Sequence, residues 1–399
     1  MSCSDRLRRV LAVAEPVQDI LERRVEDARV PPWCEARNWA PFLLALSETQ
    51  LREAEAHGLG ALLPTLPEAP ADLRELGRES ASATALSPIE GNTELGAEAL
   101  RSVRLRKRAQ LSGLLAAVAG MAEAAERIVD VGAGSGHFTR LSADLFERDA
   151  LGLEHNAARV AAAQERSDGS RATFLAVDAR SALELSERDL AIGLHACGEL
   201  GDRLVAAAGG AGCDLALVSC CLQKISTPTR APLAFGFELK REHLGLTNLT
   251  AQPRGIEATI EVTIAARETR YALGLLLRAR GVELEPGAEM SGINRRRANA
   301  GLADVAARAL ALRGLPPATD TELRHHLTVA AADYARIRRL SLPRSMLARL
   351  VEVLVSLDRA AHLEQRGLEV RVGQLFEPAI SPRNIGIFAS RSGPRLPAA

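Results

Sequence analysis

Five short apolar runs alternate with alanine-rich segments in the middle of the chain, and this alternation most limits the folds open to it. The apolar runs are residues 128–131, 151–154, 174–177, 190–194 and 215–218, separated by helical segments such as 156–164 and 200–208. Strands that alternate with helices form a parallel sheet with helices on both faces. We therefore predict an α/β domain in this region.

Two further apolar segments near the C-terminus predict the end of the same sheet. They span residues 368–376 and 384–389 and are separated by a turn-like stretch that contains Pro378 and Pro382. Short strands joined by a proline-containing turn indicate a hairpin. We expect an antiparallel pair that returns to the edge of the sheet.

The rest of the chain is predicted to be mainly helical. Residues 38–55 indicate a helix-turn-helix, residues 94–123 a long helix and residues 300–366 further helices, while the alternating piece 256–264 indicates an added strand. The predicted regions are N-terminal helices (1–92), a core with five strands (93–222), a mixed and helical insertion (223–366) and the closing hairpin (367–392).

A glycine-rich turn, within the segment IVDVGAGSGHFTRL (128–141), follows the first predicted strand. Glycines are needed where the backbone turns tightly or a ligand approaches it closely. The dinucleotide-binding fingerprint has Gly or Ala at the position that the large His137 occupies here. The Gly-Lys-Ser/Thr motif of a P-loop is absent, which excludes that type of phosphate-binding loop. The spacing of Gly132, Gly134 and Gly136 is instead typical of loops that bind S-adenosylmethionine (SAM), which we predict as the cofactor.

Two acids follow at corresponding positions in the next two units. Glu154 ends the second predicted strand, where a carboxylate can accept both hydroxyls of a ribose through charge-assisted hydrogen bonds. Asp178 follows the third strand, where a carboxylate can accept the exocyclic amine of adenine. Open α/β sheets bind ligands at this edge. The predicted cofactor-binding residues are Asp130, Gly132, Gly134, Gly136, Glu154, Asp178 and His195.

The ends of the fourth and fifth strands carry the candidate chemical groups. His195 and Cys197 follow the fourth strand, and Cys220 and Cys221 follow the fifth. His195 is a candidate base, or a group that orients the acceptor, because imidazole titrates near neutrality. Three interpretations of the cysteines stay open: zinc ligands together with His195, small apolar core residues, or a nucleophile for C5 methylation of pyrimidines. The predicted catalytic residues are His195, Cys197 and Cys220, with no metal assigned.

Charge and cysteine content limit the cellular setting. The chain has 50 basic and 50 acidic residues, which argues against a surface coated with positive charge for non-specific nucleic-acid binding. Six cysteines are few, and we expect a reducing cytoplasmic setting rather than a disulfide framework. The N-terminus has no apolar stretch of signal-peptide length, and no apolar run approaches the length of a membrane span. We expect a soluble protein that does not act on a membrane.

Several segments together resemble a known group of methyltransferases. GLHACGELGDRL (193–204) and VSCCLQK (218–224) resemble the His-x-Cys-Gly and Cys-Cys elements of that group, and LFEPAISPRNIGIFASR (375–391) resembles its closing hairpin. RLRKRAQL (104–111) resembles its Lys-Lys-x-His/Gln element before the SAM loop. The group includes the eukaryotic methyltransferase-like proteins labelled "ribosomal RNA adenine dimethylase domain-containing" and, more distantly, tRNA 2′-O-methyltransferases.

The resemblance implies SAM binding at the glycine loop and the two acids, and it places Lys107, Gln110 and Cys221 beside the substrate. The chain differs after Cys221, where Leu222 and Gln223 replace two histidines of the tRNA enzymes, and this argues against tRNA as the substrate. The dimethylase label does not transfer, because the Asn/Asp-Pro-Pro-Tyr/Phe motif that serves methylation of exocyclic amines is missing after the fourth strand.

We predict a class I SAM-dependent methyltransferase: a Rossmann-like, seven-stranded α/β sheet with an antiparallel last strand, N-terminal helices and a helical insertion. The acceptor is left open, with RNA or protein favoured, and the oligomeric state is not predicted. One alternative is a SAM- or S-adenosylhomocysteine-binding module without catalysis that acts as a scaffold on RNA or ribosomes. Another is a nicotinamide-dependent oxidoreductase, against which His137 argues.

Overall fold

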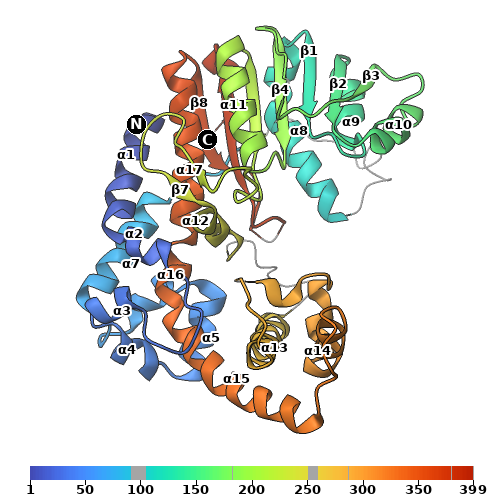
Figure 1. Ribbon diagram of the computed structural model, residues 1–399. Helices are drawn as coiled ribbons and strands as arrows, with labels where there is room; N and C mark the ends of the chain where they lie inside the picture. The colour runs from blue at the N-terminus through green and yellow to red at the C-terminus, as the bar shows by residue number, and fades with distance from the viewer. Residues whose placement is uncertain (91–104, 182, 250–258, 286, 379, 399) are drawn as a thin grey trace. The chain divides into compact units, whose positions relative to one another are not determined.

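A computed structural model describes residues 1–90, 105–181, 183–249, 259–285, 287–378 and 380–398 of the chain (Figure 1). These residues form two units. The first comprises residues 1–18, 79–252 and 347–399, and the second comprises residues 19–78 and 253–346. The four regions expected from the sequence remain a prediction about how the chain is organised.

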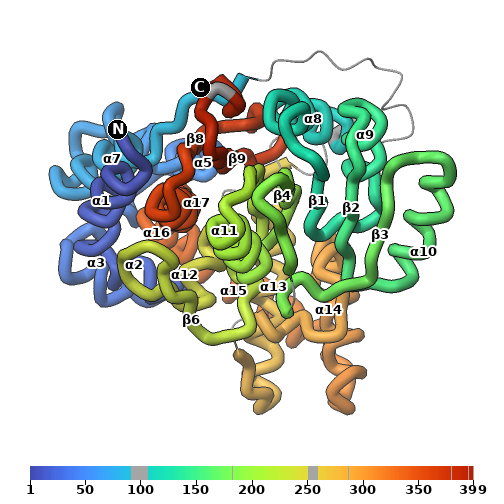
Figure 2. Tube along the Cα trace, turned by 90° about the horizontal axis from the view of Figure 1, so that it is seen from above, coloured from blue at the N-terminus to red at the C-terminus, as the bar shows by residue number. Residues whose placement is uncertain are grey.

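A seven-stranded sheet is the centre of the first unit, with the order β3-β2-β1-β4-β5-β9-β8 (Figure 2). Its first five strands are parallel, whereas β9 runs antiparallel to both β5 and β8. This is the strand order of the class I methyltransferase fold, so the predicted fold class is confirmed. The strands are β1 (Arg127–Val131), β2 (Asp149–Glu154), β3 (Ala172–Ala176), β4 (Asp189–Leu194), β5 (Asp214–Val218), β8 (Glu369–Gln374) and β9 (Ile385–Ser390).

The central strands are continuous apolar runs because helices cover both of their faces. Every residue of β5 and of β9 is buried. The register aligns the carboxyl ends of the parallel strands: Val131 pairs with Leu153, and Leu194 pairs with Val218. The loops that follow β1, β2, β4 and β5 therefore begin at one edge of the sheet.

Helices pack against this sheet and against one another. Residues of α8, α9 and the strands share one hydrophobic core, in which Leu111, Leu114 and Phe138 are buried. Elsewhere in the first unit, α17 contacts both α11 and α1. The helices are α1 (Cys3–Ala14), α8 (Leu105–Ala124), α9 (His137–Phe146), α10 (Ala157–Glu165), α11 (Glu199–Ala211), α12 (Arg241–Leu246) and α17 (Ala348–Gln365).

Two predicted elements of the first unit can be compared directly with the structure. The closing hairpin is confirmed by β8 and β9, and the long helix predicted for 94–123 is described as α8 from Leu105 onward, with 94–104 outside the described residues. A separate pair of short strands, β6 (Thr229–Arg230) and β7 (Leu239–Lys240), lies between β5 and α12 in the chain.

The second unit is helical among its described residues. One hydrophobic core joins α13, α14 and α15 through residues that include Leu273, Leu276, Val305 and Ala330. The helices are α2 (Gln18–Glu22), α3 (Pro32–Ala36), α4 (Ala40–Ala45), α5 (Glu48–His57), α6 (Leu59–Leu62), α7 (Ala71–Ala83), α13 (Ile260–Ala279), α14 (Leu302–Ala311), α15 (Asp320–Leu340) and α16 (Leu342–Met346).

The strand predicted for 256–264 is wrong over the residues that the structure describes. Residues 260–264 form the first turns of α13, and residues 256–258 lie outside the described part. Thr259 caps the helix, because its side-chain oxygen accepts the N–H of Val262 at 3.4 Å. A helix-capping residue of this kind favours a helix, although the apolar residues that follow alternate as they would in a strand.

Among the described residues, no helix has the length and hydrophobicity needed to cross a bilayer.

Candidate active site at the carboxyl edge of the sheet

The glycine loop joins β1 to α9 and is fastened to β2. Gly132, Gly134 and Gly136 all have positive φ, at 82°, 60° and 70°. The N–H groups of Gly132 and Ala133 donate to the carbonyl oxygen of Leu153 across 2.8 and 3.0 Å. The loop therefore has a backbone path that favours glycine, held in place by the end of the second strand.

Glu154 is held at the end of β2 by two main-chain donors, with an imidazole close by. Its Oε2 accepts the main-chain N–H of Gly134 at 3.1 Å, and its Oε1 accepts the main-chain N–H of Asn156 at 3.0 Å. The Nδ1 atom of His155 lies 2.9 Å from Oε1. The Glu154 residue is 5% exposed, and its carboxylate is hydrogen-bonded to the glycine loop although its backbone is part of β2. The structure thus brings Glu154 and the glycine loop together.

The glycines differ in what surrounds them. A Cβ on Gly136 would lie 2.4 Å from Cζ of Phe174, and one on Gly152 would lie 2.5 Å from Cδ1 of the same ring. A Cβ on Gly134 would meet nothing closer than the carbonyl oxygen of Gly132, at 3.9 Å. Gly136 and Gly152 are therefore required by packing against Phe174, whereas a Cβ on Gly134 would make only an ordinary contact.

Asp130 is the penultimate residue of β1, just before this loop. It is 3% exposed, and the hydroxyl of Thr139 donates to its Oδ2 at 2.6 Å. Burial raises the pKa of Asp130 to about 6, although the hydrogen bond from Thr139 and the charge of Lys107 oppose the rise. Lys107 of α8, predicted as a substrate contact, therefore lies within electrostatic range of this carboxyl group.

Asp178 is less firmly placed than Glu154. Its side chain is exposed and pairs with Arg180, two residues further along, at 2.9 Å. The hydrogen bond from Arg180 holds the pKa of Asp178 at about 2. No hydrogen bond or ion pair among the described residues joins Asp178 to the glycine loop, so its predicted role stays a prediction.

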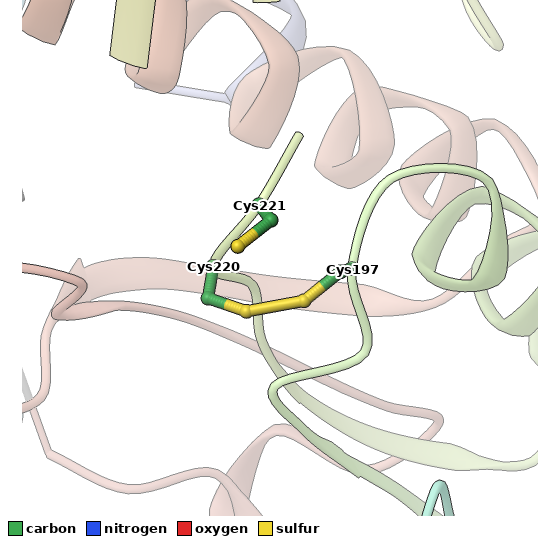
Figure 3. Close-up of side chains that lie close together, drawn as sticks. All are labelled: Cys197, Cys220 and Cys221. Atoms are coloured by element: carbon green, nitrogen blue, oxygen red, sulfur yellow. A yellow bond between two sulfur atoms is a disulfide. The ribbon is translucent and has the colours of Figure 1, made fainter. Parts of the chain in front are cut away.

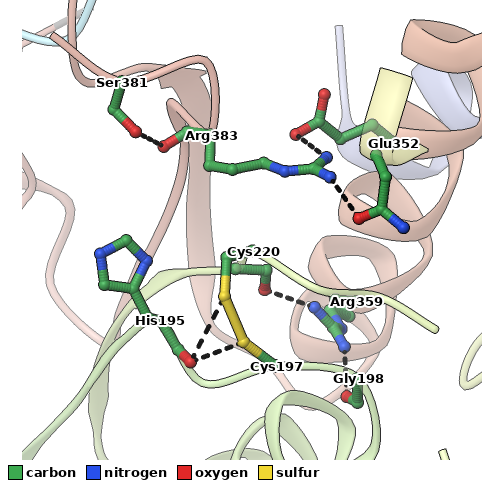
Figure 4. The surroundings of a disulfide bond; sticks show 10 residues. His195, Cys197, Gly198, Cys220, Glu352, Arg359, Ser381 and Arg383 are labelled. Atoms are coloured by element: carbon green, nitrogen blue, oxygen red, sulfur yellow. Dashed lines mark hydrogen bonds and ion pairs between the residues drawn. A yellow bond between two sulfur atoms is a disulfide. The ribbon is translucent and has the colours of Figure 1, made fainter. Parts of the chain in front are cut away.

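His195 follows β4 in an unusual backbone conformation. Its φ is +68°, and its N–H donates to the carbonyl oxygen of Val218 at 2.8 Å. Such conformations are uncommon for residues other than glycine and often occur at functional sites. The residue is exposed, and its imidazole extends away from the neighbouring sulfur atoms while its carbonyl oxygen faces them (Figure 4).

Cys197 and Cys220 are joined by a disulfide, with their Cα atoms 5.4 Å apart (Figure 3). The Sγ atom of Cys221 lies within 4.8 Å of both sulfur atoms. The disulfide differs from the thiols that every sequence interpretation assumed. It forms because β4 and β5 are neighbours in the sheet, a relation that the separation of 23 residues along the chain does not reveal.

The cysteine loops are held by a buried arginine that the sequence analysis did not single out. Arg359 of α17 is fully buried, and its guanidinium donates to the carbonyl oxygen of Gly198 at 2.8 Å and to the hydroxyl of Ser219 at 2.6 Å. Gly198 follows Cys197, and Ser219 precedes Cys220. One guanidinium thus connects the ends of β4 and β5 (Figure 4).

Arg359 is itself part of a buried ion-pair network. Asp202 of α11 accepts from Arg359 at 2.8 Å and from Arg230 at 2.8 Å, and Arg230 also pairs with Asp358 at 2.8 Å. Burial acts to raise the pKa of Asp202, but the two guanidinium groups outweigh it and leave the pKa below its ordinary value. The sequence signal was the charged pair Asp358-Arg359 between the apolar residues of VLVSL and AA in α17.

Asn384 is a second buried polar residue near this edge. Its Nδ2 donates to the carbonyl oxygen of Phe376 at 3.0 Å, and since a carbonyl only accepts, this contact fixes the orientation of the amide. Its Oδ1 is buried and has no hydrogen-bond partner in the described part of the chain. Asn384 lies two residues before Gly386, which pairs with Val218, so it is placed near the end of β5.

The predicted substrate contact Gln110 lies on α8 and is buried. Three residues further along α8, a Cβ on Gly113 would lie 3.0 Å from the ring of Phe376, so α8 packs closely on the turn that carries Asn384. The middle of α8, one turn beyond Gln110, therefore lies close to this turn.

Residues 106–228 match the model of a family described as a methyltransferase domain. This stretch begins in α8 and contains β1 to β5, the glycine loop, both acids and the His-Cys cluster. The match and the strand order agree in indicating the methyltransferase class of fold.

Solved methyltransferase structures align with about a third of the chain. The sugar N-methyltransferase KedS8 from a Streptoalloteichus species is 20% identical over 33% of this chain and 59% of its own, with a TM-score of 0.25. CalS10, an amino pentose methyltransferase from Micromonospora echinaspora with SAM bound, is 24% identical over 33% of this chain and 59% of its own, with a TM-score of 0.24. This chain thus spans less than two thirds of their length, and likeness at this level carries nothing about substrates.

Proposed function

We propose that the first unit is a SAM-dependent methyltransferase. The observation that carries this proposal is the hydrogen bond that joins the glycine loop to the acid ending β2: the carboxylate of Glu154 accepts the Gly134 N–H at 3.1 Å. Open α/β sheets bind their ligands at this edge. The match of residues 106–228 to a methyltransferase domain supports the same assignment.

The residues at this edge suit SAM in shape and charge. Glu154 has carboxylate lone pairs that remain available to ribose hydroxyls beside the two main-chain N–H groups that it already accepts. The buried carboxyl of Asp130 lies where a positively charged ligand would favour its ionised form. Asp178 is proposed to accept the adenine amine, in place of or beside its contact with Arg180.

SAM supplies a methyl group made electrophilic by a positively charged sulfur. The role of the protein is to hold the acceptor in line with that methyl group and to keep water away from the reacting atoms. His195 is proposed to orient the acceptor or take its proton, because its imidazole is exposed at the end of β4 and its backbone is fixed by Val218. The buried Oδ1 of Asn384 is a further hydrogen-bond acceptor at the end of β5.

We propose RNA or protein as the acceptor and the cytoplasm as the setting. The resemblance to the "ribosomal RNA adenine dimethylase domain-containing" group rests on the His-Ala-Cys-Gly and Cys-Cys elements and on the Ser-Pro-Arg-Asn element before β9. In the structure these three elements surround the ends of β4 and β5, as expected if they serve one acceptor site.

The purified chain tests the proposal when it is incubated with radiolabelled SAM and an extract of cells that lack it. We expect label to enter the RNA or the protein fraction and to be absent with the Gly134→Asp variant. If calorimetry shows SAM binding but no fraction is labelled, the chain is a non-catalytic SAM-binding module. If the chain binds NADH and not SAM, it belongs to the oxidoreductase class instead.

A further inference from the structure

Three cysteine sulfur atoms gather at the ends of β4 and β5. Cys197 and Cys220 are bonded, and Cys221 contributes a third sulfur within 4.8 Å of both (Figure 3). All three residues are partly exposed, whereas the other described free cysteines, Cys3, Cys34 and Cys213, are buried. Partly exposed cysteines are the ones that reagents in solution can reach.

A structural metal centre does not fit this cluster well. Structural zinc sites take four protein ligands. Among the described residues, the group that could hold an ion contains only the three cysteines, and no imidazole or carboxylate oxygen joins them. His195, the nearest candidate by sequence, presents its carbonyl oxygen to the sulfur atoms and turns its ring away (Figure 4).

The surroundings suit a pair of thiols as well as the disulfide. The carbonyl oxygen of His195 lies 2.9 Å from Sγ of Cys197 and 3.8 Å from Sγ of Cys220. A disulfide has no proton to donate to that oxygen, but each S–H of the reduced pair is placed to do so. The same carbonyl thus offers an acceptor that only the dithiol form uses.

Arg359 anchors one residue of each loop whether or not the sulfur atoms are bonded, so reduction loosens the rest of each loop without separating the two. Its guanidinium bonds Gly198 on one loop and Ser219 on the other, and it is fully buried. The two thiols therefore stay near one another after reduction. Such pre-organisation favours closing the bond again.

We propose that Cys197 and Cys220 form a reversible dithiol–disulfide site, modified by small-molecule thiols and disulfides, that controls the order of the β4 and β5 loops. This inference rests on the proposed function only in assigning those loops to the methyl-acceptor side. Disulfides in the cytoplasm are in general transient and catalytic or redox-sensing, which is the behaviour expected of this pair in that setting.

The chemistry balances with a low-molecular-weight disulfide as oxidant. One cysteine thiolate attacks that disulfide, forms a mixed disulfide and releases one small thiol. The second cysteine thiolate attacks the mixed disulfide, the Cys197–Cys220 bond forms, and a second small thiol leaves. Two protons and two electrons pass from the protein to the small disulfide, and reduction by excess small thiol reverses both steps.

Alkylation and peptide mapping of the full chain test the site in buffers with different ratios of oxidised to reduced glutathione. We expect Cys197 and Cys220 to be joined at high ratios, alkylated at low ratios and interconverted without loss. The Cys221→Ser variant is the matched control and should show the same transition. The proposal is overturned if both cysteines are alkylated at every ratio, or if the reduced chain holds about one zinc ion that protects all three thiols.

Hydrogen exchange tests the effect on the loops. On reduction, amides in 195–200 and 219–225 should exchange about tenfold faster, while those of the glycine loop at 132–136 should not change. Cys197→Ser should show the fast rates in both buffers. Equal rates in the oxidised and reduced parent would contradict control of loop order. Neither experiment needs SAM or methyl transfer, so a chain that fails as a methyltransferase still gives a result here.

Discussion

The main-chain N–H of Gly134 donates to Oε2 of Glu154 across 3.1 Å, so the glycine loop after β1 and the acid that ends β2 form one hydrogen-bonded unit. The loop path and the carboxylate position depend on each other. A ligand that binds one of them must therefore meet the other, and this coupling leads to the first prediction.

Glu154→Gln should weaken SAM binding by about tenfold or more. Charge-assisted bonds to the ribose hydroxyls are lost, and the amide N–H₂ must face the main-chain N–H of either Gly134 or Asn156, which it cannot accept. Calorimetric titration with SAM measures the change in Kd. Glu165→Gln, at an exposed position on α10, is the control and should bind as the parent does. A Kd within twofold of the parent for Glu154→Gln would remove Glu154 from the cofactor site.

Gly152→Ala should destabilise the fold by about 1–3 kcal/mol, because its Cβ would lie 2.5 Å from the ring of Phe174. Gly210→Ala in α11, where a Cβ meets nothing within 4 Å, should be neutral or slightly stabilising. Urea unfolding measures both effects. In a Phe174→Leu background the cost of Gly152→Ala should fall by about 1 kcal/mol or more. Additive costs would show that the ring is not the obstacle.

Asp130 should make the fold less stable as pH rises from about 4 to about 6. Burial raises its pKa from 3.8 to about 6, so in this window the folded chain keeps a proton that the unfolded chain has lost. Unfolding releases that proton, and the free energy of unfolding falls with rising pH by up to about 3 kcal/mol in total. Asp130→Asn should lack this component when its unfolding free energy is compared with the parent's at each pH. A constant difference between the two proteins would contradict the shift.

Arg359→Met should destabilise the first unit by about 3–5 kcal/mol, because it leaves the buried Asp202 with one cation fewer and frees the Gly198 carbonyl and the Ser219 hydroxyl. Arg203→Met is the control, since its ion pair with Glu199 is exposed and should contribute less than about 1 kcal/mol. Chemical denaturation followed by circular dichroism distinguishes them. Similar small losses in the two variants would show that the network does not support the loops.

The sheet was predictable because its central strands are short, buried and mainly apolar runs that alternate with helical segments. Residues 128–131 and 215–218 became β1 and β5, and the two C-terminal segments became β8 and β9, as expected. The strand predicted for 256–264 failed because Thr259 begins a helix there, and apolar residues that alternate over a few positions also fit one face of a helix turn.

The parts of the candidate site that consecutive segments of the chain build could be predicted from the sequence. The parts that depend on which strands and helices become neighbours could not. The glycine loop and Glu154 are positioned by consecutive elements, and the structure joins them. The Cys197–Cys220 disulfide and the Arg359 contacts depend on which strands and helices become neighbours, and residue spacing alone does not carry that information. Spacing also does not reveal that Phe174 from β3 occupies the space that a Cβ on Gly136 would take.

The SAM affinity of Gly134→Asp tests the central claim most directly. Gly134 has a φ of 60°, a conformation that aspartate tolerates, and a Cβ there would meet only the carbonyl oxygen of Gly132 at 3.9 Å, so the variant should fold. Gly169→Asp, at a φ of 75° with nothing within 4 Å, is the matched control in a distant loop. In calorimetric titrations, we predict that the parent and Gly169→Asp bind SAM alike and that Gly134→Asp shows no measurable binding. Equal binding by all three proteins would contradict the assignment of this loop as the cofactor site.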